Sequence, residues 1–264
     1  MNMGIIAASR LRASAIRPFI IEVDTSKAGS ASDSFQFTGA EGNYDVVAKQ
    51  GGSIVETFND LSSQETITFS NGSGVYVLEV TAKEINNFRE IRFANGGDKN
   101  KIVDIKQWGN ILWRTMDRAY FGCLSLSVSA TDSPDLSNCT SLQQMFKDAK
   151  NANPDTTNWD VSNIRNFSSM FYDSGFNNIV NNWNTSSGIE MKNLFIGTPF
   201  NQPLNNWDVS NVTEMKNMFL NASSFNQDLS EWCVTNIASE PLNFDTGANS
   251  WVLPNSRPIW GTCP

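Results

Sequence analysis

The stretch NWDVSNVTEMKNMFLNASSFNQDL, residues 206–229, carries the pattern that decides the fold. Related versions occupy residues 158–171 (NWDVSNIRNFSSMF) and residues 182–195 (NWNTSSGIEMKNLF). Aromatic residues recur every 24 or 25 positions in two series, one of Trp159, Trp183, Trp207 and Trp232 and one of Phe121, Phe146, Phe171, Phe195, Phe219 and Phe244. A constant period of this length is typical of repeat architectures, in which each unit stacks on its neighbours. We therefore predict a solenoid over residues 94–232.

Each repeat has a pattern that predicts one strand and one helix. Trp207 and Val209 alternate with polar residues, which indicates a short strand with both side chains inward. The following Asn211-Val-Thr-Glu214 fits a capping box at the start of a helix. Apolar residues at 212, 215, 218 and 219 then fall on one helical face. The sequence therefore predicts strand-helix units of 24 residues, completed by a final repeat and a C-terminal cap at residues 233–264.

The region before the repeats, residues 18–93, has the alternating pattern of short β-strands. Candidate strands are residues 19–24, 34–38, 44–49, 65–70, 75–82 and 90–94. Turn-forming stretches such as Asn71-Gly-Ser-Gly74 separate these strands. Short strands at this spacing predict a small antiparallel β-sandwich of the immunoglobulin-like kind. Together with the predicted helices of the repeats, this places the chain in the α+β class.

Composition excludes several classes of function. The chain of 264 residues has 19 basic and 27 acidic residues, and its net charge of −8 disfavours binding to nucleic acid and to anionic membranes. The absence of histidine removes Ser-His-Asp triads, Cys-His pairs and His-bearing zinc sites. Four cysteines without a CxxC pair suggest neither a redox motif nor a zinc site. We expect no catalytic residue, metal or cofactor, and a carboxylate-based carbohydrate-active enzyme is the remaining enzymatic alternative.

The first 17 residues are basic, in contrast to the rest of the chain. Arg10, Arg12 and Arg17 lie in a segment without an acidic residue. The short apolar run at residues 4–8 precedes the arginines, the reverse of the order in a secretory signal, and no run reaches the length of a membrane span. The segment is interpreted either as a frayed terminus or as an arm that anchors the chain to a larger assembly through arginine–carboxylate pairs.

Residues 206–229 resemble the repeat of the BspA-like leucine-rich repeat surface proteins, and the resemblance extends over residues 100–264. Residues 93–109 (FANGGDKNKIVDIKQWG) resemble the entry into such an array, and the ending from Trp232-Cys-Val to Trp260-Gly-Thr-Cys-Pro264 resembles its C-terminal cap. Residues 18–93 are similar, more weakly, to the PKD-like sandwich that precedes these arrays. The PKD-like sandwich usually carries an acidic loop. The corresponding residues of this chain, 46–52, read VVAKQGG and contain no acidic residue.

This resemblance implies a non-catalytic, exposed protein used in adhesion or recognition. Most members of the family enter the secretory route, and this chain shows no recognisable signal for that route. We therefore expect a virion protein, such as a phage capsid decoration, head fibre or tail protein, present in multiple copies with its repeats outward. The alternative is an adhesin of the bacterial cell surface.

Two rows of polar residues are the candidate binding surface of the repeats. One row contains Asp135, Asp160, Asn184 and Asp208, and the other contains Ser162, Ser186 and Ser210 together with Ser137. They are interpreted either as a solvated face that stabilises turns or as a recognition surface for a host protein or glycan, where many weak contacts add up. A row of carboxylates lacks the convergent geometry of a calcium site.

The end of the array is expected to be held by a disulfide. A terminal repeat has no neighbour to cover its apolar face and needs a cap. Cys233 takes the place where other repeats have Asp or Asn, and Cys263 lies in the C-terminal tail. We predict a Cys233–Cys263 disulfide that holds the tail across the last repeat. Cys139 takes an inward position, and we expect Cys139 and Cys123 to be thiols in the core.

Overall fold

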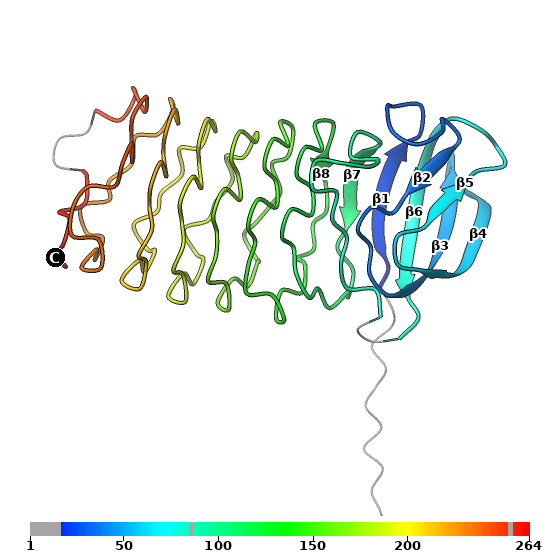
Figure 1. The fold of residues 1–264 in the computed structure, drawn as a ribbon, viewed down its shortest axis with the longest axis horizontal. Helices are drawn as coiled ribbons and strands as arrows, with labels where there is room; N and C mark the ends of the chain where they lie inside the picture. The colour runs from blue at the N-terminus through cyan, green and yellow to red at the C-terminus, as the bar shows by residue number, and fades with distance from the viewer. Residues whose placement is uncertain (1–16, 85–86, 253–255) are drawn as a thin grey trace, which may run out of the picture.

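The computed structural model describes residues 17–84, 87–252 and 256–264. Figure 1 shows an elongated molecule with a β-sheet at one end and a row of stacked coils that leads to the C-terminus at the other. We call residues 108–252 the coil stack. The strands in chain order are β1 (Phe19–Asp24), β2 (Ser34–Gln36), β3 (Asn43–Gln50), β4 (Ser53–Ser62), β5 (Thr66–Thr68), β6 (Val75–Ala82), β7 (Ile102–Gln107) and β8 (Ser127–Val128).

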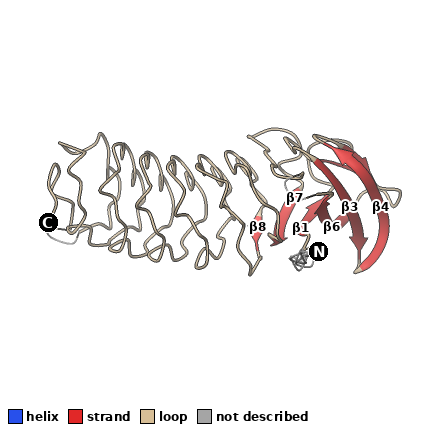
Figure 2. Cartoon of the chain, turned by 90° about the horizontal axis from the view of Figure 1, so that it is seen from below, coloured by secondary structure: helices blue, strands red, loops and turns tan. Residues whose placement is uncertain are grey.

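Six of these strands form one mixed sheet in the order β4-β3-β6-β1-β7-β8 (Figure 2). Strands β2 and β5 pair in a second, two-stranded sheet. All pairs of the large sheet are antiparallel except β7 with β8, which is parallel. Alternation directs Phe19, Ile21 and Val23 of β1 into the core and leaves the residues between them half-buried. Because β1 pairs with β7, the sheet continues from the front region into the segment that leads to the coils.

Several strands of the front region were predicted closely. β1 and β6 have the predicted bounds, and the bounds of β2, β3 and β5 differ from the predicted ones by at most two residues. Residues 90–94 do not form a strand, and only Glu90 joins a single bridge, with Glu41. β4 was missed because it is an edge strand whose exposed side chains do not alternate clearly with buried ones. The strand pairs within residues 18–93 are all antiparallel. The structure departs from the predicted sandwich because the large sheet continues beyond residue 93 into β7 and the parallel strand β8, which makes the whole sheet mixed.

The predicted α+β class and its leucine-rich-repeat-type solenoid of strand-helix units are wrong, because no α-helix occurs in the described residues. The chain of the coil stack instead runs through successive turns. In the segment predicted as a helix, Met218 N donates to Met215 O at 3.1 Å, a bond within one turn. The next amide, Phe219 N, donates to Phe244 O at 2.8 Å, and this carbonyl belongs to the following coil. Alternate amides therefore bond within a coil and between coils, whereas a helix needs each amide bonded four residues back.

Residues in the left-handed region explain why these turns do not continue as helices. Asn217 and Asn221 both have a φ of 56°. Equivalent positions in neighbouring coils share this conformation, namely Gln144, Asp148, Ser169, Asp173, Asn193 and Asn243. A left-handed residue every few positions interrupts a right-handed helix, and asparagine and aspartate tolerate this conformation better than most residues.

Aromatic columns run through the coil stack and confirm the 24-residue period. Trp159, Trp183, Trp207 and Trp232 are buried and stacked, with ring centroids 6.1–6.5 Å apart. A second column contains Phe146, Phe171, Phe195 and Phe219, with nearly parallel rings. Tyr120 begins this column in place of the expected Phe121, whose ring lies near the Lys147 ammonium instead. The prediction of which side chains point inward was therefore largely correct, whereas the predicted helical backbone between them was wrong.

The described residues contain no helix that is long and apolar enough to cross a membrane.

Candidate binding groove

The first predicted row of binding residues closes turns on the surface of the coil stack. Oδ1 of Asp135 accepts a hydrogen bond from Ser137 N at 3.0 Å. The same bond joins Asp160 to Ser162, Asn184 to Ser186 and Asp208 to Ser210, at 3.0–3.2 Å. Hydrogen bonds from Ser162 lower the pKa of the Asp160 carboxyl group. These side chains therefore hold the backbone with one oxygen each, and the serines of the second row are their local partners.

Asparagine side chains form a second, regular feature on the same surface. Asn163 Nδ2 donates to Ser137 O at 3.2 Å, and Asn211 Nδ2 donates to Ser186 O at 2.9 Å. Asn236 continues the series with a bond to Ser210 O at 2.7 Å. Each of these amides joins its coil to the preceding one. Asn211 was expected to cap a helix, and that prediction is wrong because its side chain bonds to the neighbouring coil.

Residue 187 interrupts this series of asparagines. The equivalent positions 138, 163, 211 and 236 are all asparagine, whereas this coil has Ser187. A serine side chain is too short to reach across to the preceding coil as asparagine does. In the part of the chain that the structure describes, no bond from Ser187 to Ser162 corresponds to those of Asn163 and Asn211. A gap in the surface is therefore expected between these two coils.

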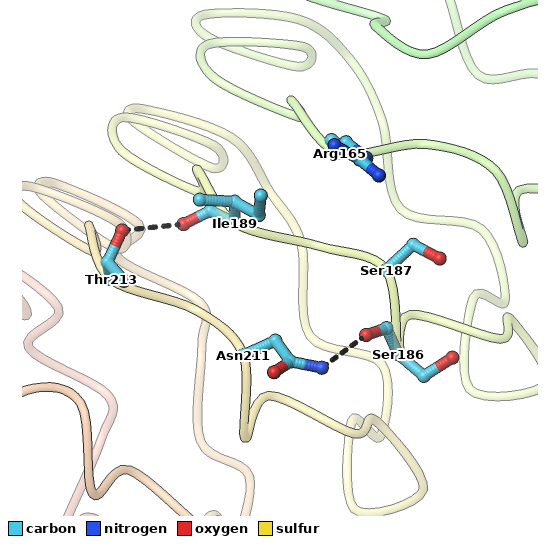
Figure 3. Close-up of a pocket in the computed structure, with 6 residues that line it drawn as sticks. All are labelled: Arg165, Ser186, Ser187, Ile189, Asn211 and Thr213. Atoms are coloured by element: carbon cyan, nitrogen blue, oxygen red, sulfur yellow. Dashed lines mark hydrogen bonds between the residues drawn. The ribbon is translucent and has the colours of Figure 1, made fainter.

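A groove lies at this point. It consists of two adjoining hollows of about 510 and 410 Å³, and both are lined by Arg165 and Ser187. The first hollow is also lined by Ser137, Asn138, Thr140 and Asn163, and the second by Ser186, Ile189, Asn211 and Thr213. Figure 3 shows the second hollow, with Arg165, Ser187 and Asn211 contributed by successive coils. We call the two hollows together the groove.

Arg165 has a backbone that is hydrogen-bonded to the coils on both sides and a side chain that is unpaired. Its N–H donates to Thr140 O at 2.8 Å, and its carbonyl accepts from Ile189 N at 2.8 Å. The side chain is exposed, and within residues 17–84, 87–252 and 256–264 it makes no salt bridge. Ile189, which lines the same hollow, is 37% exposed. The groove thus presents one free guanidinium group among neutral polar side chains and one apolar side chain.

The groove was not predicted from the sequence, and the predicted rows enter it only through Ser186 and Ser137. The signal that could have revealed it is the single serine among the asparagines at the equivalent positions. Among the described residues, no group of three or more Cys, Asp or Glu side chains could hold a metal ion.

The predicted anchoring arginines lie far from the groove in sequence. Arg17 forms a salt bridge of 2.9 Å with Asp132, and its amide donates to the Asn110 side chain at 3.0 Å. Asp132 also accepts hydrogen bonds from Trp108 N and Gly109 N. Arg17 is therefore attached to the start of the coil stack. Arg10 and Arg12 lie outside the described residues.

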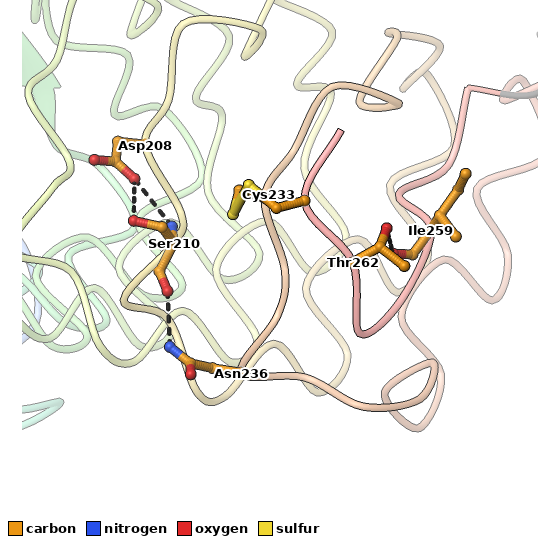
Figure 4. Close-up of a disulfide and its surroundings, with 7 residues drawn as sticks. Asp208, Ser210, Cys233, Asn236, Ile259 and Thr262 are labelled. Carbon is orange, nitrogen blue, oxygen red and sulfur yellow. Dashed lines mark hydrogen bonds between the residues drawn. A yellow bond between two sulfur atoms is a disulfide. The ribbon is translucent and has the colours of Figure 1, made fainter.

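The C-terminal tail lies across the last coil, and a disulfide joins Cys233 to Cys263, the pair that the sequence predicts (Figure 4). Val234 N donates to Thr262 O at 2.8 Å beside this bond. The Trp260 ring packs edge-on against Phe244 with their centroids 4.9 Å apart, and Phe244 in turn meets Phe219, the last ring of the phenylalanine column, at an interplanar angle of 84°. Cys123 and Cys139 are free and buried, and burial raises the pKa of the Cys139 thiol to about 12.

Replacing both Cys233 and Cys263 with serine should lower the free energy of unfolding by about 3–4 kcal/mol on the chain-entropy account of a crosslink. The two cysteines are 30 residues apart, so the disulfide closes a loop of substantial length. Urea unfolding of the oxidised parent, the reduced parent and the double variant measures the effect. The reduced parent should match the double variant. Equal midpoints for all three samples would show that the tail stays in place without the disulfide.

Comparison with known proteins assigns a family to the coil stack. Residues 88–178 and residues 140–251 match DUF285, described as a Mycoplasma protein of unknown function. No curated protein and no solved structure matches the chain. The two matches overlap and together cover more than half of the sequence, and the chain therefore belongs to the DUF285 family.

Proposed function

We propose that the protein is a non-enzymatic attachment module, displayed on an outer surface with its coil stack exposed for recognition. The observation that carries this proposal is the groove, which interrupts an otherwise regular polar face of the stack. A rigid stack of coils suits recognition because its side chains are held in fixed positions and bind without a large ordering cost. The Cys233–Cys263 disulfide supports an extracellular location, because disulfides persist in oxidising environments.

We infer that this surface is that of a virion, with the protein as a capsid decoration, head fibre or tail component in multiple copies. Residues 1–16, with Arg10 and Arg12, would then attach the protein to the particle, whereas Arg17, the third predicted anchoring arginine, is paired with Asp132 within the chain. Because Arg17 is held by Asp132, the arm would leave the folded part of the chain at the junction of the sheet and the coil stack. Several copies on one particle would compensate for weak binding at each groove.

The second candidate is a bacterial cell-surface adhesin. The description of the DUF285 family names Mycoplasma, and this match is compatible with the BspA-like resemblance of the repeats. In both cases the coil stack faces outward and recognises a glycan or a protein of the host. A carboxylate-based carbohydrate-active enzyme is a third candidate, and it differs because it would release a cleaved sugar.

Removal of residues 1–16 tests the attachment. The shortened protein keeps Arg17 and should fold as the parent does, but it should be lost from purified particles or cell envelopes. Antibody labelling of intact particles and of intact cells separates the virion from the cell surface. Incorporation of the shortened protein at the level of the parent would contradict the role of the arm. Incubation with host glycans should give binding without a cleaved product, and release of sugar would identify an enzyme.

A further inference from the structure

The groove exists because one side chain that joins neighbouring coils is shortened. Asn163 and Asn211 each cross to a carbonyl group of the preceding coil, and Ser187 lies between them at the equivalent position. An asparagine at 187 would extend toward Ser162 and occupy the space that the two hollows share. The serine therefore opens the surface next to the unpaired guanidinium group of Arg165.

We propose that the groove binds a carboxylated sugar of a glycan, with the carboxylate on Arg165. This inference rests on the proposed attachment function and names the chemical class of the ligand. The arginine side chain presents a planar set of N–H donors that pairs with both oxygens of a carboxylate. Its backbone bonds to Thr140 and Ile189 fix the point from which the side chain extends.

The other groups in the groove suit the remainder of a sugar ring. Ser187 offers a hydroxyl group, and the Thr213 hydroxyl, which donates to Ile189 O at 3.5 Å, keeps its oxygen as an acceptor. The Asn211 nitrogen is bonded to Ser186 O, and its side-chain oxygen is a further acceptor. Ile189 provides an exposed apolar surface for the C–H groups of the ring. The hollows of about 410 and 510 Å³ have the size of small-molecule sites.

Charge and lining favour a single carboxylate on a sugar over other anions. The chain has a net charge of −8, so a nucleic acid or another polyanion is repelled. The groove itself contains only one charged residue, Arg165, and its remaining lining is neutral. A peptide would need several apolar contacts to bind, and the groove supplies only Ile189. A glycan fits the single positive charge through one isolated carboxylate, and it fits the neutral polar lining through its many hydroxyl groups.

The experiment uses the full chain on an array of oligosaccharides ending in sialic acid or glucuronic acid, each beside its carboxyl-reduced form. The parent should bind at least one carboxylated compound about tenfold or more tightly than its reduced form, as expected for charge-assisted pairing. Arg165→Gln should lose this preference. Ser187→Asn should also lose binding although it retains Arg165, because the longer side chain fills the groove.

Lys216→Gln is the matched control, because Lys216 is an exposed cation of the same stack that does not line the groove. This variant should bind as the parent does, and thermal melting should show that all three variants are folded. Equal binding by Arg165→Gln and the parent, equal binding of carboxylated and reduced sugars, or no binding to any compound on the array would each overturn the proposal. Incorporation into particles or envelopes is measured separately, so the attachment function can stand when the groove proposal fails.

Discussion

Replacing Trp207 with alanine should lower the free energy of unfolding by about 3–5 kcal/mol. The Trp207 ring lies between those of Trp183 and Trp232, at centroid distances of 6.1 and 6.5 Å, with interplanar angles of 7° and 0°. Its Nε1 donates to Val180 O at 2.8 Å, which joins two coils. Removal of the ring therefore leaves a cavity between two stacked rings and a buried carbonyl group without this donor. Urea unfolding followed by circular dichroism measures the change.

Trp207→Phe is the control for the shape of the ring. Phenylalanine keeps an aromatic ring in the column but lacks the Nε1 donor to Val180 O, so its loss should be smaller, about 1–3 kcal/mol for a buried acceptor left unpaired. The order of stability should thus be parent, phenylalanine variant, alanine variant. An alanine variant that unfolds at the same urea concentration as the parent would show that the column does not support the stack.

Replacing Lys101 with methionine should destabilise the protein by about 3–5 kcal/mol, the cost of breaking a buried charged pair. Lys101 is fully buried, and its ammonium group donates to the carbonyl groups of Ser30, Ala31 and Ser34 at 2.7–3.0 Å. Asp98, which is also buried, lies 3.8 Å from the same nitrogen. Methionine would leave these oxygens and the Asp98 carboxylate without their cation. Thermal and urea unfolding of the variant measure the loss.

Lys27→Met is the matched control for Lys101→Met. Lys27 forms a more exposed pair with Asp24 at 3.9 Å, and surface pairs of this kind contribute about 0–1 kcal/mol. A Lys101 variant as stable as the Lys27 variant would show that the buried ammonium group is not required.

The pH dependence of stability gives a second measurement for Lys101. Burial lowers the pKa of Lys101 from its ordinary value of 10.5, so the unfolded chain binds the proton more strongly than the folded protein does. Stability contributed by this group therefore increases as the pH rises from the folded pKa toward 10.5. The methionine variant should lack this increase relative to the parent. The same pH profile in both proteins would contradict the lowered pKa.

The sequence by itself determined the features that depend on spacing along the chain. The step of 24 residues between Trp159, Trp183 and Trp207 predicted that these rings stack in one column. Period-two alternation predicted β1 and β6 with their correct bounds. The position of Cys233 in the last repeat and of Cys263 in the tail predicted their disulfide. For the rings and the strands, the choice between inside and outside follows from the order of apolar and polar residues.

Only the tertiary structure decided how the backbone runs between those positions. Residues 212–219 have apolar side chains at the spacing of a helix, and a chain of turns can place the same side chains inward. The turns form because the amides of Asn217 and Phe219 find acceptors in the next coil, Leu242 O and Phe244 O, which a single repeat does not contain. Asn217 adopts a positive φ to direct its amide there. Helix propensity is a weak preference, and such contacts between neighbouring coils override it.

The tertiary structure also decided the presence of the groove. Arg165 and Ser187 are 22 residues apart, and they line the same hollow because they belong to adjacent coils. The missing asparagine at 187 leaves a gap only because the side chains of Asn163 and Asn211 each span the distance between two coils. The sequence showed which residue differs from the repeat. The stacking of the coils turned that difference into a groove, because a short side chain leaves space only where its longer equivalents reach across to a neighbour.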